Sequence, residues 1–385
     1  MIKRTILLSA IFLALLLAGG CERQPDIQAS GKVIKLAIIG PFSGEDRAKG
    51  EDGLRGVRTA MSLSPMLQNG DKLELVIKDD KNMPSSTVSA INEAANEDQV
   101  SAVILMSTSA SALKIRPVAD ELQLPVLAML ATHPDVTEDN NFVSQLCFDN
   151  ITQGTVAALF VRDELLIDKV AVFINRDSQN SSDLAAEFIR KYQSVSGRVV
   201  DTVLVKPDVD YKAKLNDLRS KGTELLYMPV KAKDLFTIVQ TARDIGWQPD
   251  IMGSDGLLAT VISRHEEDKE LLEGIYAIDF FTEKDTSIKT ISFVDKISSS
   301  YKDLYKEKPT SYTALGLESY MIIQAAMNRC NDGSDRECIN DMLRKTDDFD
   351  GLSGKVSINK NGKASRPLVI NTIKNGHTKY VVKVY

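Results

Sequence analysis

The feature that most constrains the fold is a repeated alternation of short apolar runs and amphipathic segments, which starts at residue 32. Short apolar runs predict buried strands, and apolar residues spaced three or four apart predict helices. Strands are predicted at 33–39, 73–77, 100–106 and 125–130, and a second series follows at 169–174, 198–205, 224–228 and 250–252. Repeated strand–helix units form parallel sheets with helices on both faces. The predicted fold class is therefore α/β, with two doubly wound parallel-sheet lobes.

The final part of the chain breaks this rhythm. A strand is predicted at 274–281, helices at 291–304, 311–327 and 339–343, and strands at 355–358, 366–372 and 379–384. Helices and hairpin strands that arrive late can complete both lobes. We therefore expect the chain to cross between the lobes more than once.

The N-terminus has the pattern of an export signal. Two basic residues precede an uncharged run over 5–20, which is too short to cross a membrane comfortably. The run ends in Leu-Ala-Gly-Gly before Cys21 and resembles the lipobox of bacterial lipoproteins, in which the cysteine is lipidated. Ala18 departs from the Leu that is more usual at that position. We predict a lipoprotein signal peptide at 1–20 and a polar tether at 21–31.

Charge and length narrow the class of protein. Removing Lys3 and Arg4 with the signal peptide takes the formal charge from −6 to −8, which argues against nucleic acid as a partner. The remaining chain is too long for one typical hydrophobic core, which agrees with two lobes.

Three cysteines remain after Cys21. Cys330 and Cys338 bracket a short polar loop between two helical patterns, and in an oxidising compartment this spacing favours a disulfide. The alternative is two unrelated thiols. Cys147 lies in an apolar context, which predicts a small buried side chain rather than a reactive one.

A hydroxyl-rich turn follows the third predicted strand. Ser107, Thr108 and Ser109 stand between the apolar run and the next helical pattern. Free backbone N–H groups, hydroxyls and the positive end of the helix dipole make such a turn suitable for an anion. The alternative is that these residues only cap the helix.

The motifs of common enzyme classes are missing. The sequence has no Gly-x-Ser-x-Gly elbow, Walker loop or GxGxxG pattern. Its three histidines, His133, His265 and His377, are far apart and lack metal-ligand spacing. We expect no catalytic residues, no metal and no cofactor.

The order of short motifs along the chain carries a resemblance to a known family. GPFSG, the Ser-Thr-Ser turn, LATHP, DNITQG, MGSDG and FDGLSGKVSINKNG follow one another as in type 1 periplasmic binding proteins of the branched-chain amino acid group. The similarity covers 32–385. It implies two lobes joined by a three-crossing hinge, the periplasmic-binding-protein-like I fold.

The resemblance also implies a division of the chain. The hinge crossings are expected at 147–150, 277–281 and 350–353. The first lobe is then 32–148 plus 280–350, and the second is 149–279 plus 351–385.

Family members deliver a small solute to an ABC permease in the inner membrane. The resemblance therefore implies a monomeric protein of the periplasm or cell envelope, anchored by lipid through Cys21, whose ligand is an amino acid or related carboxylate. The alternative is a regulatory or sensor lipoprotein that uses the same fold to bind a protein partner.

Four residues match the family's ligand site. Ser107 matches a serine that binds the ligand carboxylate, and Ala131 and Thr132 match a pair that contacts both ends of the head group. Asp255 matches an acid that holds the ligand ammonium. Hydroxyls with backbone N–H groups and one carboxylate would together suit a zwitterion. As alternatives, Asp255 could be a turn former and Thr132 a helix cap.

Three further positions depart from the family's pattern. Lys49, Asn180 and Lys231 stand where amino-acid binders often place aromatic residues. They predict a more polar and cationic side-chain end than leucine requires, unless the two lysines are simply solvated. Tyr312 is interpreted as core packing rather than as a ligand contact.

Overall fold

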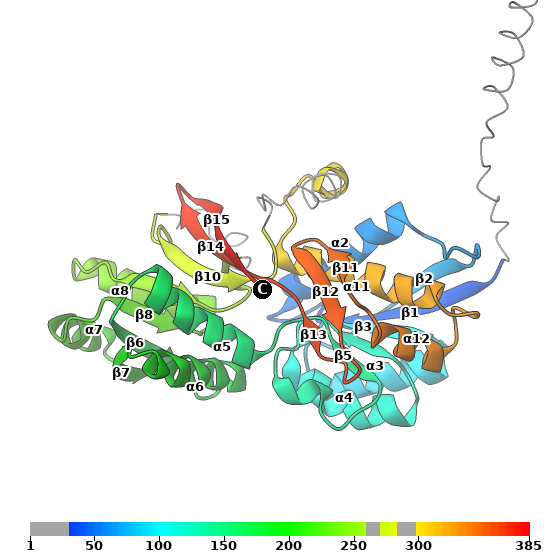
Figure 1. Ribbon diagram of the computed structural model, residues 1–385, viewed down its shortest axis with the longest axis horizontal. Helices are drawn as coiled ribbons and strands as arrows, with labels where there is room; N and C mark the ends of the chain where they lie inside the picture. Colours follow the sequence, from blue (N-terminus) through cyan, green and yellow to red (C-terminus); the bar gives the residue numbers. More distant parts are fainter. Residues whose placement is uncertain (1–30, 259–269, 283–297) are drawn as a thin grey trace, which may run out of the picture.

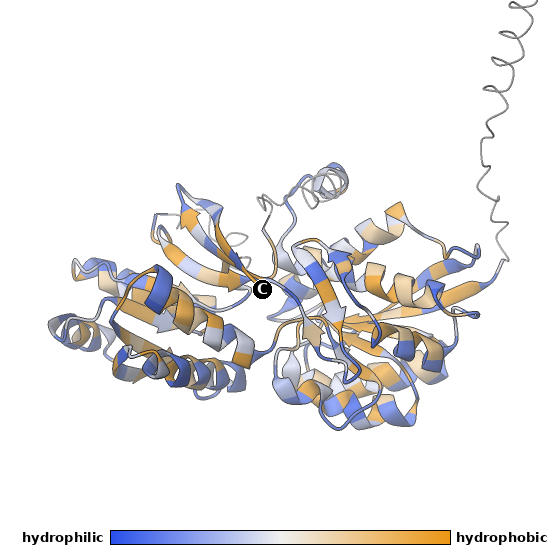
Figure 2. Cartoon of the chain, in the orientation of Figure 1, coloured by the Kyte–Doolittle hydropathy of each residue, from blue (hydrophilic) through white to orange (hydrophobic). Residues whose placement is uncertain are grey.

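The computed structural model describes residues 31–258, 270–282 and 298–385 and consists of two α/β lobes (Figure 1). The strands of both lobes are largely apolar and are flanked by amphipathic helices (Figure 2). This architecture confirms the predicted fold class. The predicted signal peptide, Cys21 and all but the last residue of the tether lie outside the described residues, as does 291–297 of one predicted helix.

The first lobe is built on a five-stranded parallel sheet of order β2-β1-β3-β4-β5. Its strands are β1 (Val33–Gly40), β2 (Lys72–Asp79), β3 (Ala102–Leu105), β4 (Val126–Ala128) and β5 (Val143–Gln145). Its main helices are α2 (Arg47–Leu63), α3 (Pro84–Asn96), α4 (Ser109–Glu121), α11 (Ser311–Asn328) and α12 (Arg336–Leu343), with a 3-10 turn η1 (Pro134–Thr137).

The alternation of side chains along β1 explains how both faces of this sheet are covered. Leu36 and Ile38 are fully buried in the core that contains α2 and α11. Ala37 and Ile39 are buried in a separate core with α3 and α4. Successive residues of a strand point to opposite faces, so a continuous apolar run is needed when both faces are buried.

Glycines let α2 and α11 approach each other closely. A Cβ at Gly56 would lie 2.0 Å from the carbonyl oxygen of Thr313, and one at Gly316 would lie 2.0 Å from that of Gly53. These neighbours are backbone atoms, which cannot rotate away. The small residues therefore determine the distance between the two helices.

The Gly56→Ala variant is expected to lower the free energy of unfolding by about 1–3 kcal/mol, because overpacking outweighs the better helix propensity of Ala. Urea unfolding measures the change. Gly53→Ala is the matched control in the same helix, since its Cβ would meet the flexible ends of Met129 and Met106 at 2.9 and 3.0 Å. Equal stabilities of wild type and Gly56→Ala would contradict the proposed role of this close contact.

The second lobe is built on a seven-stranded mixed sheet of order β15-β14-β10-β9-β8-β6-β7. Strands β6 to β10 are parallel, whereas β14 and β15 run antiparallel at one edge. The strands are β6 (Lys169–Ile174), β7 (Arg198–Leu204), β8 (Leu225–Met228), β9 (Asp250–Gly253), β10 (Ile275–Asp279), β14 (Leu368–Lys374) and β15 (His377–Val384).

The helices of this lobe again divide between the two faces. Val170 and Val172 of β6 share a core with α5 and α6, whereas Ala171 and Phe173 share one with α7 and α8. The helices are α5 (Asn150–Leu159) with a π turn η2 (Phe160–Glu164), α6 (Gln179–Ser194), α7 (Tyr211–Ser220) and α8 (Ala232–Asp244).

The final passage between the lobes differs from the prediction. Three short strands, β11 (Phe349–Gly351), β12 (Gly354–Ile358) and β13 (Ala364–Ser365), lie beside the first lobe (Figure 1). Gln145 N–H donates to Gly362 O at 2.8 Å. The chain enters the second sheet only at β14, not at 350–353. The prediction therefore placed the crossing too early. Gly351 pairs with Gly354, so these glycines close the β11–β12 hairpin instead of leading into the second lobe.

The segments between the lobes have a shared apolar core. Phe148, just before α5, stacks on Phe280, just after β10, with ring centroids 4.5 Å apart. Both rings belong to one core cluster that continues into each lobe. Crossing segments packed in this way restrict the directions in which the lobes can move.

The cysteines take the states that the sequence favoured. Cys330 and Cys338 form a disulfide between the end of α11 and α12. Cys147 is a free thiol and only 1% exposed. Within the described ranges, no helix combines the length and apolar character that a membrane span would need.

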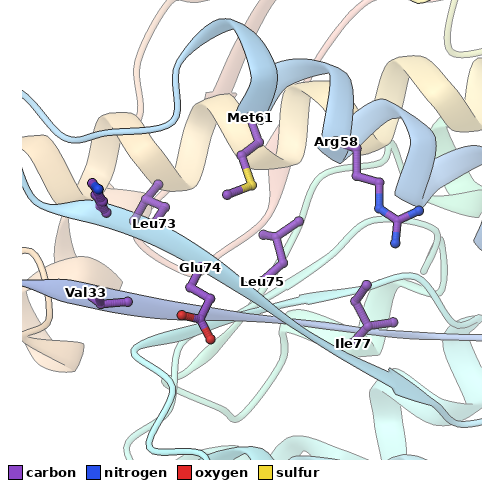
Figure 3. A pocket seen from close by; sticks show the side chains of 8 residues that line it. Val33, Arg58, Met61, Leu73, Glu74, Leu75 and Ile77 are labelled. Atoms are coloured by element: carbon purple, nitrogen blue, oxygen red, sulfur yellow. The ribbon is translucent and has the colours of Figure 1, made fainter. Parts of the chain in front are cut away.

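A groove of about 430 Å³ lies along the edge strand β2 (Figure 3). It is lined by Val33, Arg58, Met61, Lys72, Leu73, Glu74, Leu75 and Ile77. This groove contains none of the predicted site residues, so it provides a reference surface for tests of other sites.

Candidate functional site

The predicted ligand residues lie where the carboxyl ends of the two parallel sheets meet. Ser107 follows β3 and Thr132 follows β4 in the first lobe, while Asp255 follows β9 in the second. Open α/β sheets bind ligands at this edge, because loops and helix N-termini converge there. The fold thus brings together residues that are far apart in sequence.

Ser107 is anchored by a buried carboxylate that the sequence analysis did not single out. The Ser107 hydroxyl lies 2.7 and 2.6 Å from the two carboxylate oxygens of Asp80, and both residues are fully buried. Asp80 also accepts from Thr87 Oγ1 at 2.7 Å. Since the hydroxyl proton of Ser107 goes to Asp80, the hydroxyl is held in place and has no proton left to donate to a ligand in this arrangement.

The hydroxyl-rich turn does not cap α4 through a side chain. Thr108 is the N-cap residue, but its side chain accepts no capping hydrogen bond. Its N–H and Oγ1 instead donate to Asn82 Oδ1, both at 2.9 Å. The turn is therefore held by the loop after β2. No side-chain cap satisfies the first N–H groups of α4, of which that of Ser111 donates to Thr108 O.

The loop after β4 is positioned by two side chains. Ser109 Oγ accepts from the N–H groups of Thr132 and His133, both at 3.1 Å. Gln145 Nε2 donates to Ala131 O at 2.9 Å. The cap of the following turn is His133, whose Nδ1 accepts from Asp135 N–H, so Thr132 does not serve as that cap.

Asp255 is held by a two-way contact with Gln153 of α5. Gln153 Nε2 donates to Asp255 Oδ1, and Gln153 Oε1 accepts from Asp255 N–H, both at 2.8 Å. Burial raises the pKa of Asp255, while the bond from Gln153 and the charge of Lys49 lower it. The carboxylate is thus oriented and partly desolvated, which strengthens its attraction for a cation.

Lys49 is a first-lobe cation whose charge acts on Asp255. Its ammonium lies 2.9 Å from Asp46 Oδ1. Burial lowers the pKa of Lys49, but the charges of Tyr312, Asp46 and Asp255 outweigh it and hold the pKa above its usual range. Lys49 is therefore fixed as a cation close to the carboxylate predicted to bind an ammonium.

The other predicted residues make direct contacts between the lobes. Thr132 Oγ1 and Asn180 Oδ1 lie 3.4 Å apart, although Asn180 itself is exposed. Lys231 Nζ lies 3.0 Å from Glu45 Oε1, and both side chains are largely exposed. Such an exposed pair contributes little stability. Because both side chains are exposed, Lys231 lies at the rim of the interlobe contact rather than within it.

Tyr312 does more than fill a core. Its ring is 8% exposed, and its hydroxyl donates to Gly256 O of the other lobe at 3.4 Å. A Cβ at Gly256 would lie 2.3 Å from the Tyr312 hydroxyl, and Gly256 has φ of +68°. A glycine is needed here for both reasons, and Tyr312 marks the contact between α11 and the Asp255 turn.

Asp279, at the end of β10, is a second buried carboxyl beside the site. Burial raises its pKa to about 7, although hydrogen bonds from Ser311, the Phe280 N–H and Asn371 lower it, and the charge of Asp255 raises it further. Asp279 is only 3% exposed. This group is therefore protonated in the folded state over a range in which an exposed aspartate is ionised.

The stability of the protein is expected to fall as the pH rises from about 4 to about 7, by up to a few kcal/mol from Asp279 alone. In this window the folded state retains the proton and the unfolded state releases it. Urea unfolding at pH 5 and pH 8 measures the effect. In Asp279→Asn, which stays neutral, the decrease should be smaller than in wild type. Parallel decreases in the two proteins would refute this assignment.

Two positioning residues, Asp80 and Gln153, were not predicted from the sequence, whereas Ser109 was expected only as part of the hydroxyl-rich turn. Gln153 lies within the DNITQG motif, so the motif contained the signal. Asp80 stands just after the end of β2, as the predicted residues stand after other strands. Within the described ranges, no three His, Cys, Asp or Glu side chains come together as a metal site would require.

Comparisons with solved structures show strong similarity over nearly the whole described chain. The leucine-binding protein LivK of Thermotoga maritima has a TM-score of 0.81 at 29% sequence identity, covering 91% of this chain and 98% of that one. The branched-chain amino acid transporter substrate-binding protein LivJ of Streptococcus pneumoniae, in complex with isoleucine, has a TM-score of 0.79 at 24% identity, covering 91% and 99%.

Comparisons of sequence agree. A family model described as periplasmic binding protein matches residues 33–378. An amino acid binding protein of Pseudomonas aeruginosa is 24% identical over 245 residues, which make up 63% of this chain. The match spans 66% of that relative's length.

Proposed function

The chain belongs to the periplasmic binding protein family, and we propose that it captures an amino acid between its lobes and delivers it to an ABC transporter. The resemblance to the type 1, branched-chain amino acid group is confirmed. Members of this family are substrate-binding proteins, which agrees with the expectation of a protein without catalytic residues.

The proposal rests on two complementary groups at the carboxyl edges of the two sheets. The first lobe offers the N-terminus of α4, whose N-cap side chain makes no capping bond, and the second offers the oriented carboxylate of Asp255. A helix N-terminus attracts a carboxylate and Asp255 attracts an ammonium. One zwitterion between them would join the lobes, so binding would favour their closure.

The cationic side chains nearby support a polar ligand over an aliphatic one. Lys49 lies near Asp255, and Lys231 lies at the rim of the interlobe contact. The relatives include a leucine-binding protein and a protein in complex with isoleucine. We propose an amino acid with a polar or acidic side chain, with leucine and isoleucine as the comparison ligands.

A thermal-shift screen of the chain from residue 22 tests the proposal. A ligand at a hundredfold excess over its Kd should stabilise the fold by about 2.7 kcal/mol. The panel contains the amino acids and small carboxylates. A transition that no compound shifts would overturn the proposal. If a protein partner is then captured by the same chain, the regulatory alternative is favoured.

Membrane attachment is a further part of the proposal. We propose that Cys21 carries the lipid anchor and that residues 22–31 tether the body outside the cytoplasm. Metabolic labelling with a radioactive fatty acid should mark wild type and not Cys21→Ser, and the variant should leave the membrane fraction. Equal labelling of both would contradict lipidation at Cys21.

A further inference from the structure

A second cavity lies where the chain passes between the lobes. It has a volume of about 520 Å³, within the range of roughly 300–1,000 Å³ that small-molecule sites occupy. Its first-lobe wall comes from residues 344–347 after α12 and from β12 and β13. Its second-lobe wall comes from the first turns of α5 and the ends of β14 and β15. None of the residues predicted to bind the amino acid lines this cavity.

Most of the charged side chains that line the cavity are cationic. Arg344, Lys345, Lys363 and Arg366 contribute positive charges, against the single lining carboxylate of Asp347. Three of these cations have carboxylate partners, because Lys363 pairs with Asp149, Arg366 with Glu318 and, at 3.9 Å on the surface, Lys345 with Asp341.

Within the described residues, Arg344 forms no ion pair with a carboxylate. Its guanidinium donates to neutral oxygens, those of Lys360 at 3.3 Å, Asn140 at 3.3 Å and Val143 at 3.2 Å. Because these acceptors are neutral, the positive charge of Arg344 is left for an anionic ligand to neutralise.

Apolar side chains complete the walls. Phe148, Val156, Ile358, Leu368 and Val384 line the cavity together with Tyr385. A cavity with a guanidinium that lacks a counter-charge on one side and apolar groups on another suits an anion with an apolar body.

We propose that this cavity, which we name the hinge pocket, binds a small carboxylate carrying an apolar or aromatic body. The carboxylate would accept from the guanidinium of Arg344 and lie close to Lys345, while the body would contact the apolar wall. Because both lobes form the walls, an occupant that prefers one arrangement of the lobes shifts the equilibrium between them.

The test is to measure benzoate binding to the full chain by isothermal titration calorimetry. Lys345→Glu and Arg344→Gln should each weaken benzoate binding about tenfold, through loss or reversal of a charge at the anion. Matched substitutions in the groove along β2, Lys72→Glu and Arg58→Gln, should leave it within about twofold (Figure 3). Lys345 is exposed, so its substitution tests the site without threatening the fold.

Two further comparisons define the ligand and separate the hinge pocket from the amino-acid site. Benzamide and acetate should bind at least about tenfold more weakly than benzoate, since benzamide lacks the negative charge and acetate lacks the aromatic body. A saturating amount of the amino acid identified in the screen should leave benzoate binding intact. Benzoate binding that is absent, that survives both hinge-pocket substitutions, or that is abolished by that amino acid would overturn the proposal.

Discussion

Replacing Arg366 by Met is expected to lower the free energy of unfolding by about 3–5 kcal/mol. Arg366 Nη1 donates to Glu318 Oε2 at 2.8 Å, and both side chains are only 1% exposed. Removal of the arginine leaves the Glu318 carboxylate buried without its counter-charge. Urea unfolding of the two proteins at neutral pH measures the loss.

The expected loss is large because this pair connects three passages of the chain. Glu318 belongs to α11 and accepts from Leu352 N–H at 2.6 Å. Arg366 also donates to Phe280 O at 3.2 Å, with its guanidinium above the Phe280 ring. One ion pair therefore joins the passage after β10, the β11–β12 hairpin and the entry to β14.

The double variant Glu318→Gln/Arg366→Met is the decisive control. It removes both charges and keeps an acceptor for Leu352 N–H, so it should be more stable than Arg366→Met alone. A double variant that loses the sum of the two single losses would show that the two residues act independently. A loss below about 1 kcal/mol in Arg366→Met would contradict the assigned role of the pair.

Replacing Asp255 by Asn is expected to weaken amino-acid binding by about 2–5 kcal/mol, which is a loss of thirtyfold or more. The variant keeps the size of the side chain and removes the charge that is proposed to attract the ligand ammonium. Calorimetric titration with the amino acid identified in the screen measures the change. A plain carboxylate bound at the same site should be much less affected.

Gln153→Ala tests whether the orientation of that carboxylate matters. Gln153 contacts both the carboxylate and the N–H of Asp255. Its removal leaves the charge in place, so the expected loss of affinity is smaller than that of Asp255→Asn.

Equal weakening of amino acids and plain carboxylates by Asp255→Asn would contradict the assignment of Asp255 to the ammonium.

Local patterns were sufficient to predict the two sheets. The apolar run over 33–39 became β1, and the run over 169–174 became β6. Strands buried on both faces need such runs, so an apolar run indicates directly that both faces of the strand are covered. The very short strands β5, β11 and β13 were missed, because two or three residues carry no periodicity.

The candidate site was predictable in position but not in its internal contacts. Motifs after consecutive strands placed Ser107, Thr132 and Asp255 at the carboxyl edges of the sheets. The partner of Ser107 is Asp80, 27 residues away, and that of Asp255 is Gln153, 102 residues away. Nothing in the local sequence around either residue specifies such a partner.

The sequence by itself therefore determined the class of fold, the order of the strands along the chain and the edge at which a ligand could bind. Only the tertiary structure decided which side chains satisfy one another there, which lobe receives the hairpin β11–β12, and how Glu318 meets Arg366. The physical reason is that periodicity reports how a segment is buried. The partner of a buried polar group depends instead on which distant segments the packed core brings together.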